Sequence, residues 1–359
     1  MSYRIKAIRK IISEGKCTHV LVTNTVDVEY ISGFRSSNAT LLISAGGLEL
    51  FTDFRYRETA EEFCRIQRPK WKFHLIEESN FKYLAKNIAP GSKVGIQSDT
   101  VTIDQFHELK RALPKVKFAQ LSNEIANAAI QKLDKEISSM KAAAAAADKA
   151  LSALLPNIKA AMTEIELARL LENLCAENGS QKPSFETIVL FGERSSLPHG
   201  RPGSRRLAPG DFILLDFGCT VNGFCSDITR TFVFGEASLK QREIYNVVLK
   251  AQTAARKAAR SGVKSCDVDF AARDIIEKSG YGENFGHATG HGVGLRVHEK
   301  PRLNKKNEAP LLENSVITIE PGIYISGLGG VRIEDMVVLT KDGSAALTRS
   351  PRKLTELPI

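Results

Sequence analysis

The sequence has little that would point to a membrane or to the outside of a cell. No apolar run in its 359 residues approaches the roughly 18–20 residues of a membrane-spanning helix. The basic segment 1–12 is not followed by the apolar core of a signal peptide. Six cysteines are scattered without a Cys-x-x-Cys pair, which is typical of reduced thiols rather than of a disulfide framework. We therefore expect a cytoplasmic protein that does not bind membranes.

The chain also lacks the basic clusters and interleaved aromatic residues of nucleic-acid-binding proteins. Its net charge is +9, but lysines and arginines are spread along the whole sequence. Spread charge predicts a solvated surface, and we expect no nucleic-acid partner. The hydrophobic fraction of 43% is ordinary for a globular protein, and the length favours two domains.

The order of the expected elements divides the chain near residue 122. In residues 1–122, strand-like runs such as 39–44 alternate with helical patterns such as 3–14, which predicts a smaller α/β domain around a mixed sheet. Residues 123–359 begin with a strongly helical segment and continue with hairpin strands and further helices. This order predicts an α+β domain with a mostly antiparallel sheet and helices on one face.

The stretch 211–234 is the most informative part of the sequence. It predicts two strands around an Asn-Gly turn at 222–223, the strongest short-range signal for a hairpin. Counting outward from this turn pairs Asp216 with Thr229, and alternation then places Asp227 on the same face as both. Two carboxylates close together in an apolar run repel each other and lose hydration. A bound cation would explain why they are there.

Other polar side chains interrupt apolar, strand-like segments further along the chain: His287, His291 and His298 in the glycine-rich run 286–299, Glu320 before a Pro-Gly pair, and Arg332 and Glu334 in the run 329–339. Taken singly, each has an ordinary explanation as a strand-end cap, a turn residue or a loop-packing residue. Together, four carboxylates and a histidine exceed the needs of one divalent ion and predict two ions about 3.5–4 Å apart. Oxygen-rich ligation without sulfur suits Mn²⁺, Co²⁺ or Zn²⁺.

This set of residues resembles the metallopeptidase family that includes methionine aminopeptidase, aminopeptidase P and prolidase, whose catalytic domain has the pita-bread fold. The resemblance implies five metal ligands: Asp216, Asp227, His291, Glu320 and Glu334. It also implies three histidines near the substrate: His199 in Leu-Pro-His-Gly, His287 and His298. Two further residues, Tyr324 and Arg332, would support the metal ligands from the side away from the substrate.

The first domain resembles the N-terminal domain of creatinase and prolidase. The segments Tyr30–Phe34 and Phe51–Tyr56 carry this weaker resemblance. Short methionine aminopeptidases lack such a domain, and creatinase lacks the full set of metal ligands, so the resemblance favours the proline-specific branch.

The resemblance implies an Xaa-Pro aminopeptidase with two divalent metal ions, Mn²⁺ first among them, acting on peptides with proline at the second position. In that role Glu320 would shuttle a proton, His199 and His298 would stabilise charge on the carbonyl oxygen, and His287 would contact the proline side. An Xaa-Pro dipeptidase (prolidase) and a broader aminopeptidase are open alternatives. An inactive pseudo-peptidase that binds a partner is the alternative from another class. A homodimer is expected from the resemblance alone.

Overall fold

The computed structural model of the protein describes residues 3–77 and 81–359. The chain folds into two compact units, Met1–Ala129 and Ile130–Ile359. Among the described residues, no helix is both long and apolar enough to cross a lipid bilayer.

The two units divide after Ala129, later than the boundary predicted after residue 122. Residue 122 is the first residue of helix α5 (Ser122–Asn127). The end of α5 is held by the first helix of the chain. Tyr3 Oη and Arg4 Nε donate hydrogen bonds to the Ala128 carbonyl oxygen at 2.7 and 3.1 Å. For that reason α5 packs with the first unit rather than with the second.

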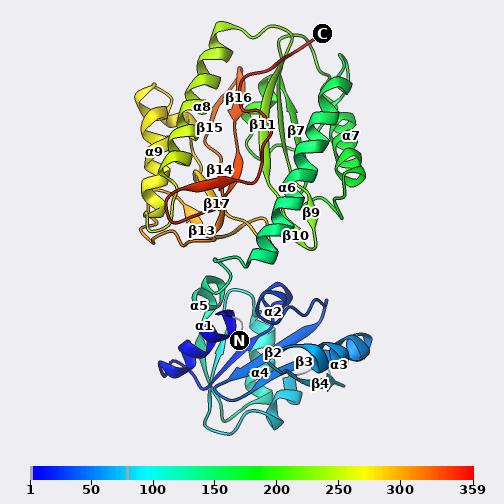
Figure 1. The fold of residues 1–359 in the computed structure, drawn as a ribbon, viewed down its shortest axis with the longest axis vertical. Helices are drawn as coiled ribbons and strands as arrows, with labels where there is room; N and C mark the ends of the chain where they lie inside the picture. The colour runs from blue at the N-terminus through cyan, green and yellow to red at the C-terminus, as the bar shows by residue number, and fades with distance from the viewer. Residues whose placement is uncertain (1–2, 78–80) are drawn as a thin grey trace. The chain divides into compact units, whose positions relative to one another are not determined.

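The first unit is built on one six-stranded mixed sheet in the order β4-β3-β2-β1-β5-β6 (Figure 1). Its strands are β1 (His19–Val22), β2 (Ala39–Ser44), β3 (Leu48–Asp53), β4 (Lys72–Ile76), β5 (Lys93–Ile96) and β6 (Lys117–Gln120). Its other helices are α1 (Tyr3–Ser13), α2 (Thr25–Ser32), α3 (Arg57–Ile66) and α4 (Ile103–Ala112), with short 3-10 turns η1 (Phe54–Tyr56) and η2 (Phe81–Lys86). The sequence did not predict α2 or β6, which are a short helix and a four-residue edge strand.

The second unit contains two sheets and two small ribbons. One sheet has the order β19-β11-β8-β7, and the other has the order β13-β12-β14-β17-β18. The strands of the first sheet are β7 (Ile188–Phe191), β8 (Phe212–Phe217), β11 (Ile228–Phe234) and β19 (Glu356–Leu357). Those of the second are β12 (Gly290–Gly292), β13 (Glu299–Leu303), β14 (Val316–Ile319), β17 (Asp335–Leu339) and β18 (Ser344–Ala346). The ribbons pair β9 (Thr220–Val221) with β10 (Phe224–Cys225), and β15 (Gly322–Ile325) with β16 (Gly329–Arg332).

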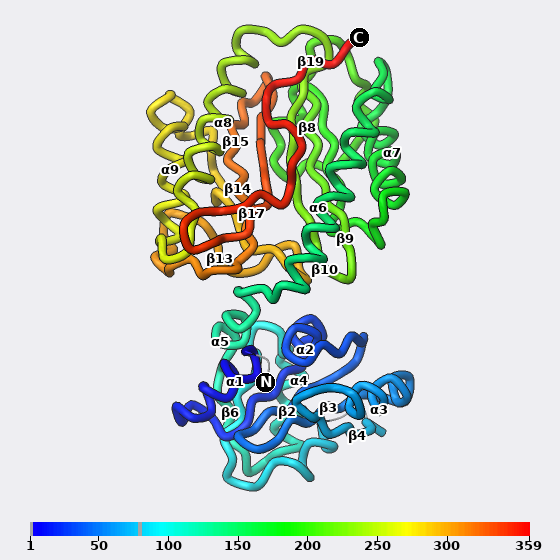
Figure 2. Tube along the Cα trace, in the orientation of Figure 1, coloured from blue at the N-terminus to red at the C-terminus, as the bar shows by residue number. Residues whose placement is uncertain are grey.

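Neighbouring strands of this unit are antiparallel, apart from β19, which returns parallel to β11 at the end of the chain (Figure 2). The helices are α6 (Asp134–Leu154), α7 (Glu164–Glu177), α8 (Leu239–Ala258) and α9 (Ser265–Lys278), with 3-10 turns η3 (Leu155–Asn157), η4 (Gly192–Ser196) and η5 (Gly282–Asn284). Capping boxes begin two of these helices, at Thr163 before α7 and at Ser238 before α8.

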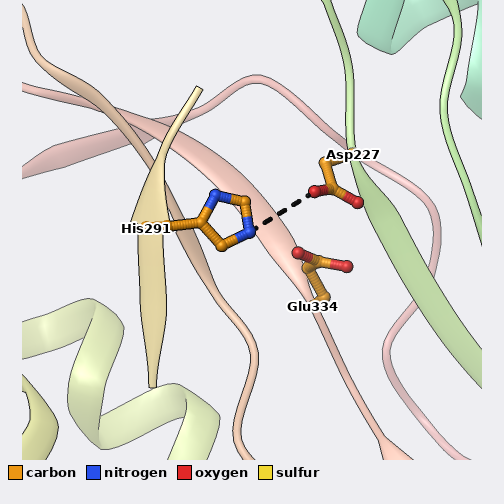
Figure 3. Close-up of side chains that lie close together, drawn as sticks. All are labelled: Asp227, His291 and Glu334. Atoms are coloured by element: carbon orange, nitrogen blue, oxygen red, sulfur yellow. Dashed lines mark ion pairs between the residues drawn. The ribbon is translucent and has the colours of Figure 1, made fainter. Parts of the chain in front are cut away.

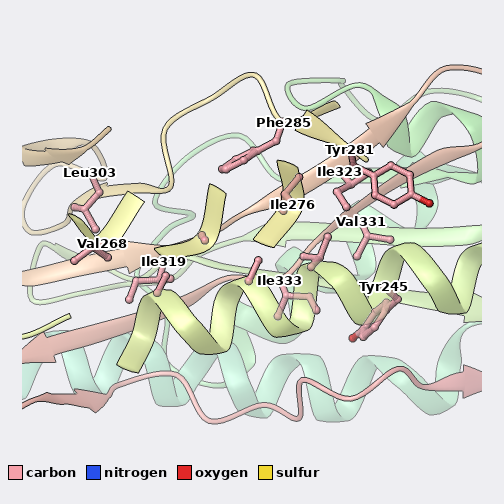
Figure 4. Close-up of a cluster of buried hydrophobic side chains, with 14 of the residues drawn as sticks. Tyr245, Val268, Ile276, Tyr281, Phe285, Leu303, Ile319, Ile323, Val331 and Ile333 are labelled. Atoms are coloured by element: carbon pink, nitrogen blue, oxygen red, sulfur yellow. The ribbon is translucent and has the colours of Figure 1, made fainter. Parts of the chain in front are cut away.

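Each sheet of the second unit is covered by one pair of helices. Helices α6 and α7 pack with β7, β8 and β11 in one apolar cluster. Helices α8 and α9 pack with β14 to β17 in another, which includes Tyr245 of α8 and Ile276 of α9 together with Ile319 and Ile333 (Figure 4). The opposite faces of these strands are therefore left for the polar side chains.

The predicted hairpin has the register that was counted from the sequence. Val221 pairs with Phe224 across the Asn-Gly turn, and Asp216 pairs with Thr229 between β8 and β11. Asn222 and Gly223 both have positive φ, 51° and 83°. Positive φ at both central residues is what a type I′ turn requires and what Asn-Gly tolerates.

Glycine in the histidine-rich segment is required by a close approach of two strands. A Cβ atom placed on Gly290 would lie 2.0 Å from the Thr318 carbonyl oxygen of β14. We expect Gly290→Ala to push β12 away from β14 and to lower the stability of the second unit by about 1–3 kcal/mol, the usual cost of overpacking. Thermal unfolding of the metal-free protein measures this, at roughly 2–4 °C per kcal/mol for a unit of this size.

The matched control is Gly343→Ala, because a Cβ there meets no atom within 4 Å. Equal melting temperatures for the two variants would contradict the close approach of β12 and β14.

Candidate metal centre

A cavity of about 410 Å³ in the second unit collects the polar residues that the sequence singled out. Its lining includes nine of the ten predicted site residues: His199, Asp216, Asp227, His287, His291, His298, Glu320, Arg332 and Glu334. The tenth, Tyr324, lies directly behind two of them. A larger and more open hollow of about 810 Å³ lies near the start of α8, but the described residues that line it include no histidine. The smaller cavity is therefore where the chemistry is concentrated.

Strand alternation explains why these side chains converge. Leu215 and Phe217 of β8 point into the cluster beneath α6 and α7, so Asp216 between them points the other way. The same rule applies to the strands under α8 and α9. Ile319 and Ile333 face those helices, while the neighbouring polar residues face the cavity.

Three of the predicted ligands form a compact group. Asp227, His291 and Glu334 each present a ligand atom, and these atoms lie within 4.8 Å of one another. Their side chains point toward a common centre from three separate segments of the chain (Figure 3). His291 Nε2 lies 3.6 Å from Asp227 Oδ2 and 3.2 Å from Glu320 Oε1. A fourth carboxylate thus borders the same group.

One carboxylate oxygen of Asp216 accepts a hydrogen bond, and the other has no partner among the described residues. Its Oδ2 accepts a hydrogen bond from Arg332 Nη2 at 2.6 Å. Its Oδ1 is buried, and no described residue forms a hydrogen bond with it. An orphaned carboxylate oxygen beside three other acidic groups fits a cation better than it fits any hydrogen-bond donor of the chain.

Arg332 and Tyr324, for which the family resemblance implies a supporting role, lie beside the acidic cluster and contact each other. Arg332 Nη1 donates a hydrogen bond to Tyr324 Oη at 2.7 Å, and Arg332 Nε donates to Thr229 Oγ1 at 3.0 Å. Burial raises the pKa of Tyr324 to about 12, so the phenol stays protonated at neutral pH. The phenol oxygen of Tyr324 can accept the hydrogen bond from Arg332 while its own proton is directed to His287, whose Nε2 lies 3.0 Å away.

Burial makes this cluster a costly place for negative charge. Burial, and then the neighbouring charges of Glu334, Asp216 and Glu320, raise the pKa of Asp227 well above its usual range. The pKa of Glu334 is raised for the same reasons, and that of Asp216 is raised by burial despite the nearby Arg332. A divalent cation would remove this penalty, because it supplies positive charge where the carboxylates converge.

Glu320 differs from the other three carboxylates. Burial alone would raise its pKa, but the hydrogen bond from His291 and the positive charge of His291, His287 and Arg332 lower it to about 2. Burial would lower the pKa of His291, but its hydrogen bond to Glu320 and the negative charges of Glu320 and Asp216 together raise it. This proton-sharing pair belongs to the metal-free protein, since a metal on His291 Nε2 would replace that hydrogen bond.

The three further histidines lie around the acidic cluster. Burial lowers the pKa of His287, so its imidazole is neutral at pH 7. His298 lies at the cavity rim with its ring 4.3 Å from that of His291, and partial burial together with the charge of His291 lowers its pKa. His199 is exposed in the loop between β7 and β8. All three surround the space where a ligand of the cavity would lie.

Sequence reasoning missed Arg302, which lies in the cavity wall opposite His291 in the register of β12 and β13. It assigned no role to two threonines beside the ligands, Thr229 and Thr318. They donate hydrogen bonds to Glu334 Oε2 at 2.8 Å and to Glu320 Oε1 at 3.2 Å. Alternation along the strands places both threonines on the ligand face, since each lies two residues from a predicted ligand. Nothing in the local pattern distinguishes Arg302 from the other surface arginines.

The sequence matches two family models. Metallopeptidase family M24 matches residues 138–341, and the creatinase/prolidase N-terminal domain matches residues 4–128. An Xaa-Pro dipeptidase of Pyrococcus horikoshii is 38% identical over 355 residues, which cover 99% of each chain. A putative dipeptidase of Bacillus subtilis is 36% identical and covers 98% of this chain and 99% of its own.

Solved structures show the same similarity. The Xaa-Pro dipeptidase from Bacillus anthracis superposes with a TM-score of 0.94 at 37% identity, over 99% of each chain. The X-Pro aminopeptidase from Thermotoga maritima superposes with a TM-score of 0.87 at 34% identity, over 99% of this chain and 100% of its own.

The raised pKa values predict how metal binding depends on pH. A carboxyl group whose pKa is higher in the folded protein than its unfolded value of about 4 stabilises the fold at low pH, and that stability is lost as the pH rises. A bound cation restores the stability that is lost at high pH, but at a pH below the raised pKa values it competes with protons for the carboxylates. We therefore expect the rise in melting temperature on adding Mn²⁺ to the chelator-treated protein to be larger at pH 8 than at pH 5.

Thermal unfolding with and without Mn²⁺ at the two pH values measures this difference. Asp227→Asn should reduce the rise at pH 8, whereas Asp274→Asn, which removes an exposed carboxylate paired with Lys278, should leave it unchanged. A rise that is equal at both pH values, or that survives in Asp227→Asn, would refute the assignment of the carboxylate cluster to the metal.

Proposed function

The chain belongs to metallopeptidase family M24, and we propose that it is an Xaa-Pro dipeptidase whose two divalent metal ions are held by Asp216, Asp227, His291, Glu320 and Glu334. As a member of this family it is a metal-dependent hydrolase that acts on peptides. The comparisons favour the dipeptidase alternative over the Xaa-Pro aminopeptidase that was first expected. The single observation that carries the metal-dependent reaction is the convergence of these donors in one cavity.

The donor set supports two divalent ions rather than one. Four carboxylates supply more negative charge than one ion neutralises, and one buried oxygen of Asp216 is still without a partner. Carboxylate and imidazole donors without sulfur favour Mn²⁺, with Co²⁺ and Zn²⁺ as alternatives. When bound, such ions supply Lewis acidity, which activates water at neutral pH and polarises a carbonyl group.

The residues of the chain supply the proton transfer and the orientation. Glu320 accepts a proton as the peptide bond is attacked and delivers it to the proline nitrogen as that bond breaks. His298 at the rim and His199 in the loop donate hydrogen bonds to the developing charge on the carbonyl oxygen. His287, fixed by Tyr324, contacts the proline side of the substrate.

Arg302 supports the preference for a dipeptide. The cavity wall contains two arginines, and the charge of one, Arg332, is already matched by Asp216. The guanidinium of Arg302 lies on the same wall as His298, at the exposed end of the cavity. A planar guanidinium binds a carboxylate through two parallel hydrogen bonds. In an Xaa-Pro dipeptide the proline carries that carboxylate, whereas in a longer peptide it is replaced by an amide.

Two further properties complete the proposal. The cysteines are all free, which fits a reducing compartment such as the cytoplasm. A homodimer is proposed from the family resemblance, and sedimentation measures it directly.

The activity itself is tested with a peptide panel in the presence of Mn²⁺. We expect Ala-Pro to be cleaved with a kcat/KM at least tenfold above that for Ala-Pro-Ala, because only in the dipeptide does the proline itself carry the carboxylate that Arg302 would bind. Ala-Ala serves as the control for proline at the second position. Faster cleavage of the tripeptide would favour assignment as an Xaa-Pro aminopeptidase. Activity that survives complete removal of metal would exclude the metal-dependent reaction.

Arg302→Met tests the basis of the dipeptide preference. Loss of a charged hydrogen-bond pair of about 1.5–3 kcal/mol should raise the KM for Ala-Pro about ten- to hundredfold, with a smaller change in kcat. The KM for Ala-Pro-Ala should change little. Lys305→Met removes an exposed cation three residues further on, paired with Glu277, and should leave both substrates unaffected. An unchanged KM for Ala-Pro in Arg302→Met would place the carboxylate site elsewhere.

A further inference from the structure

The loop that carries His199 to the cavity is closed at its base by one buried carboxylate. This loop, residues 191–203, leaves β7 at Phe191 and returns toward α7 at Gly203. Glu164, the first residue of α7, is completely buried beneath it. Its Oε1 accepts a hydrogen bond from the Phe191 N–H at 2.9 Å, and its Oε2 accepts one from the Gly203 N–H at 2.8 Å. A single side chain thus binds both ends of the 191–203 loop.

The charge of Glu164 is matched from within the loop. Arg194 Nε lies 3.1 Å from Oε1 and 3.0 Å from Oε2 of the carboxylate. The same guanidinium donates through Nη2 to the Arg201 carbonyl oxygen at 2.8 Å. Arg194 therefore joins the outgoing and returning parts of the loop, and Glu164 accepts two hydrogen bonds from the same guanidinium.

The middle of the loop is attached to the wall of the cavity. Ser195 Oγ accepts a hydrogen bond from the Gly330 N–H of β16 at 2.8 Å. The Pro198 carbonyl oxygen lies 3.5 Å from Nη1 of Arg332, the residue that also binds Asp216. His199, the next residue, is exposed, so the backbone of the loop sets its position rather than packing around its ring.

We propose that Glu164 is a positioning residue for His199: by binding both ends of the 191–203 loop, it holds the imidazole where it meets the substrate. This inference rests on the role of His199 in the proposed function. Glu164 lies behind β7 and does not line the cavity, so it acts only through the loop. A carboxylate suits this place because it only accepts hydrogen bonds, and all three groups directed at it are donors.

Glu164→Gln is the informative change, because it keeps the shape and replaces one acceptor oxygen with a donor. One of the donors at the loop base then faces an NH₂ group and loses its partner. We expect kcat for Ala-Pro to fall at least tenfold, with KM changed less than threefold and metal content unchanged. Amide hydrogen exchange should become faster in peptides from the 191–203 loop and stay unchanged in the strands that carry the metal ligands.

A double-mutant cycle with His199→Ala separates positioning from general structural damage. If Glu164 acts through His199, then Glu164→Gln should lower kcat less than twofold when His199 is already alanine. An equal fall in kcat with His199 and with alanine at position 199 would overturn the proposal. Unchanged amide hydrogen exchange in the 191–203 loop would also overturn it. Should Glu164→Gln fail to fold, Arg194→Gln removes the matching charge and keeps both backbone bonds, and the same cycle applies to it.

Glu356→Gln is the matched control. Glu356 likewise accepts from a backbone N–H, that of Ala237, and from an arginine, Arg242, both at 2.6 Å. It lies outside the cavity lining, so its kcat should stay within twofold of the unmodified protein. If the unmodified protein cleaves no Xaa-Pro dipeptide, the proposed function fails, and loop exchange in Glu164→Gln still decides whether Glu164 holds the loop.

Discussion

Buried negative charge is the constraint on which the second unit depends. Asp216, Asp227 and Glu334 are buried in or next to apolar strands, where neither water nor distance relieves their repulsion. Arg332 binds Asp216, whereas burial and the neighbouring carboxylates raise the pKa values of Asp227 and Glu334 well above their usual range. Such a cluster is stable at neutral pH only if protons or metal ions enter it. Folding and metal binding are therefore linked in this unit, and the chemistry of the family follows from that linkage.

The two pairs of helices make this arrangement possible. They cover one face of each sheet with apolar side chains, so the opposite face of the same strands is free to carry charge. The five proposed metal ligands reach one cavity from five segments, and each of them lies in a strand or next to the end of one. Threonines between the ligands use the same alternation, and the hydroxyl of Thr229 contacts Glu334 on one side and Arg332 on the other. The ligands are thus held by strand geometry more than by loops.

Strand geometry also explains which parts of the site could be predicted from the sequence. The Asn-Gly turn fixed the register that pairs Asp216 with Thr229, and the alternation of β14 and β17 exposed Glu320 and Glu334 as misplaced charges. Residues that act through tertiary contacts could not be recognised from turn signals or strand alternation. Glu164 reads as an ordinary first-turn acid of a capped helix, and its burial under the 191–203 loop is a product of packing. The short helix α2 and the edge strand β6 were missed because their patterns are too short for a periodicity to stand out.

The metal ligands alone cannot decide between a dipeptidase and an aminopeptidase. Structures with either name superpose on this chain over almost its whole length, with TM-scores of 0.94 and 0.87. The reacting carbonyl group lies at the metals in both reactions, so the difference must lie where the residue after proline would be placed. We propose that in this chain this region is the rim lined by His298 and Arg302, of which Arg302 lies on the strand next to His291. In this proposal the charge of the rim, rather than the metal centre, distinguishes a free proline carboxylate from a continuing peptide.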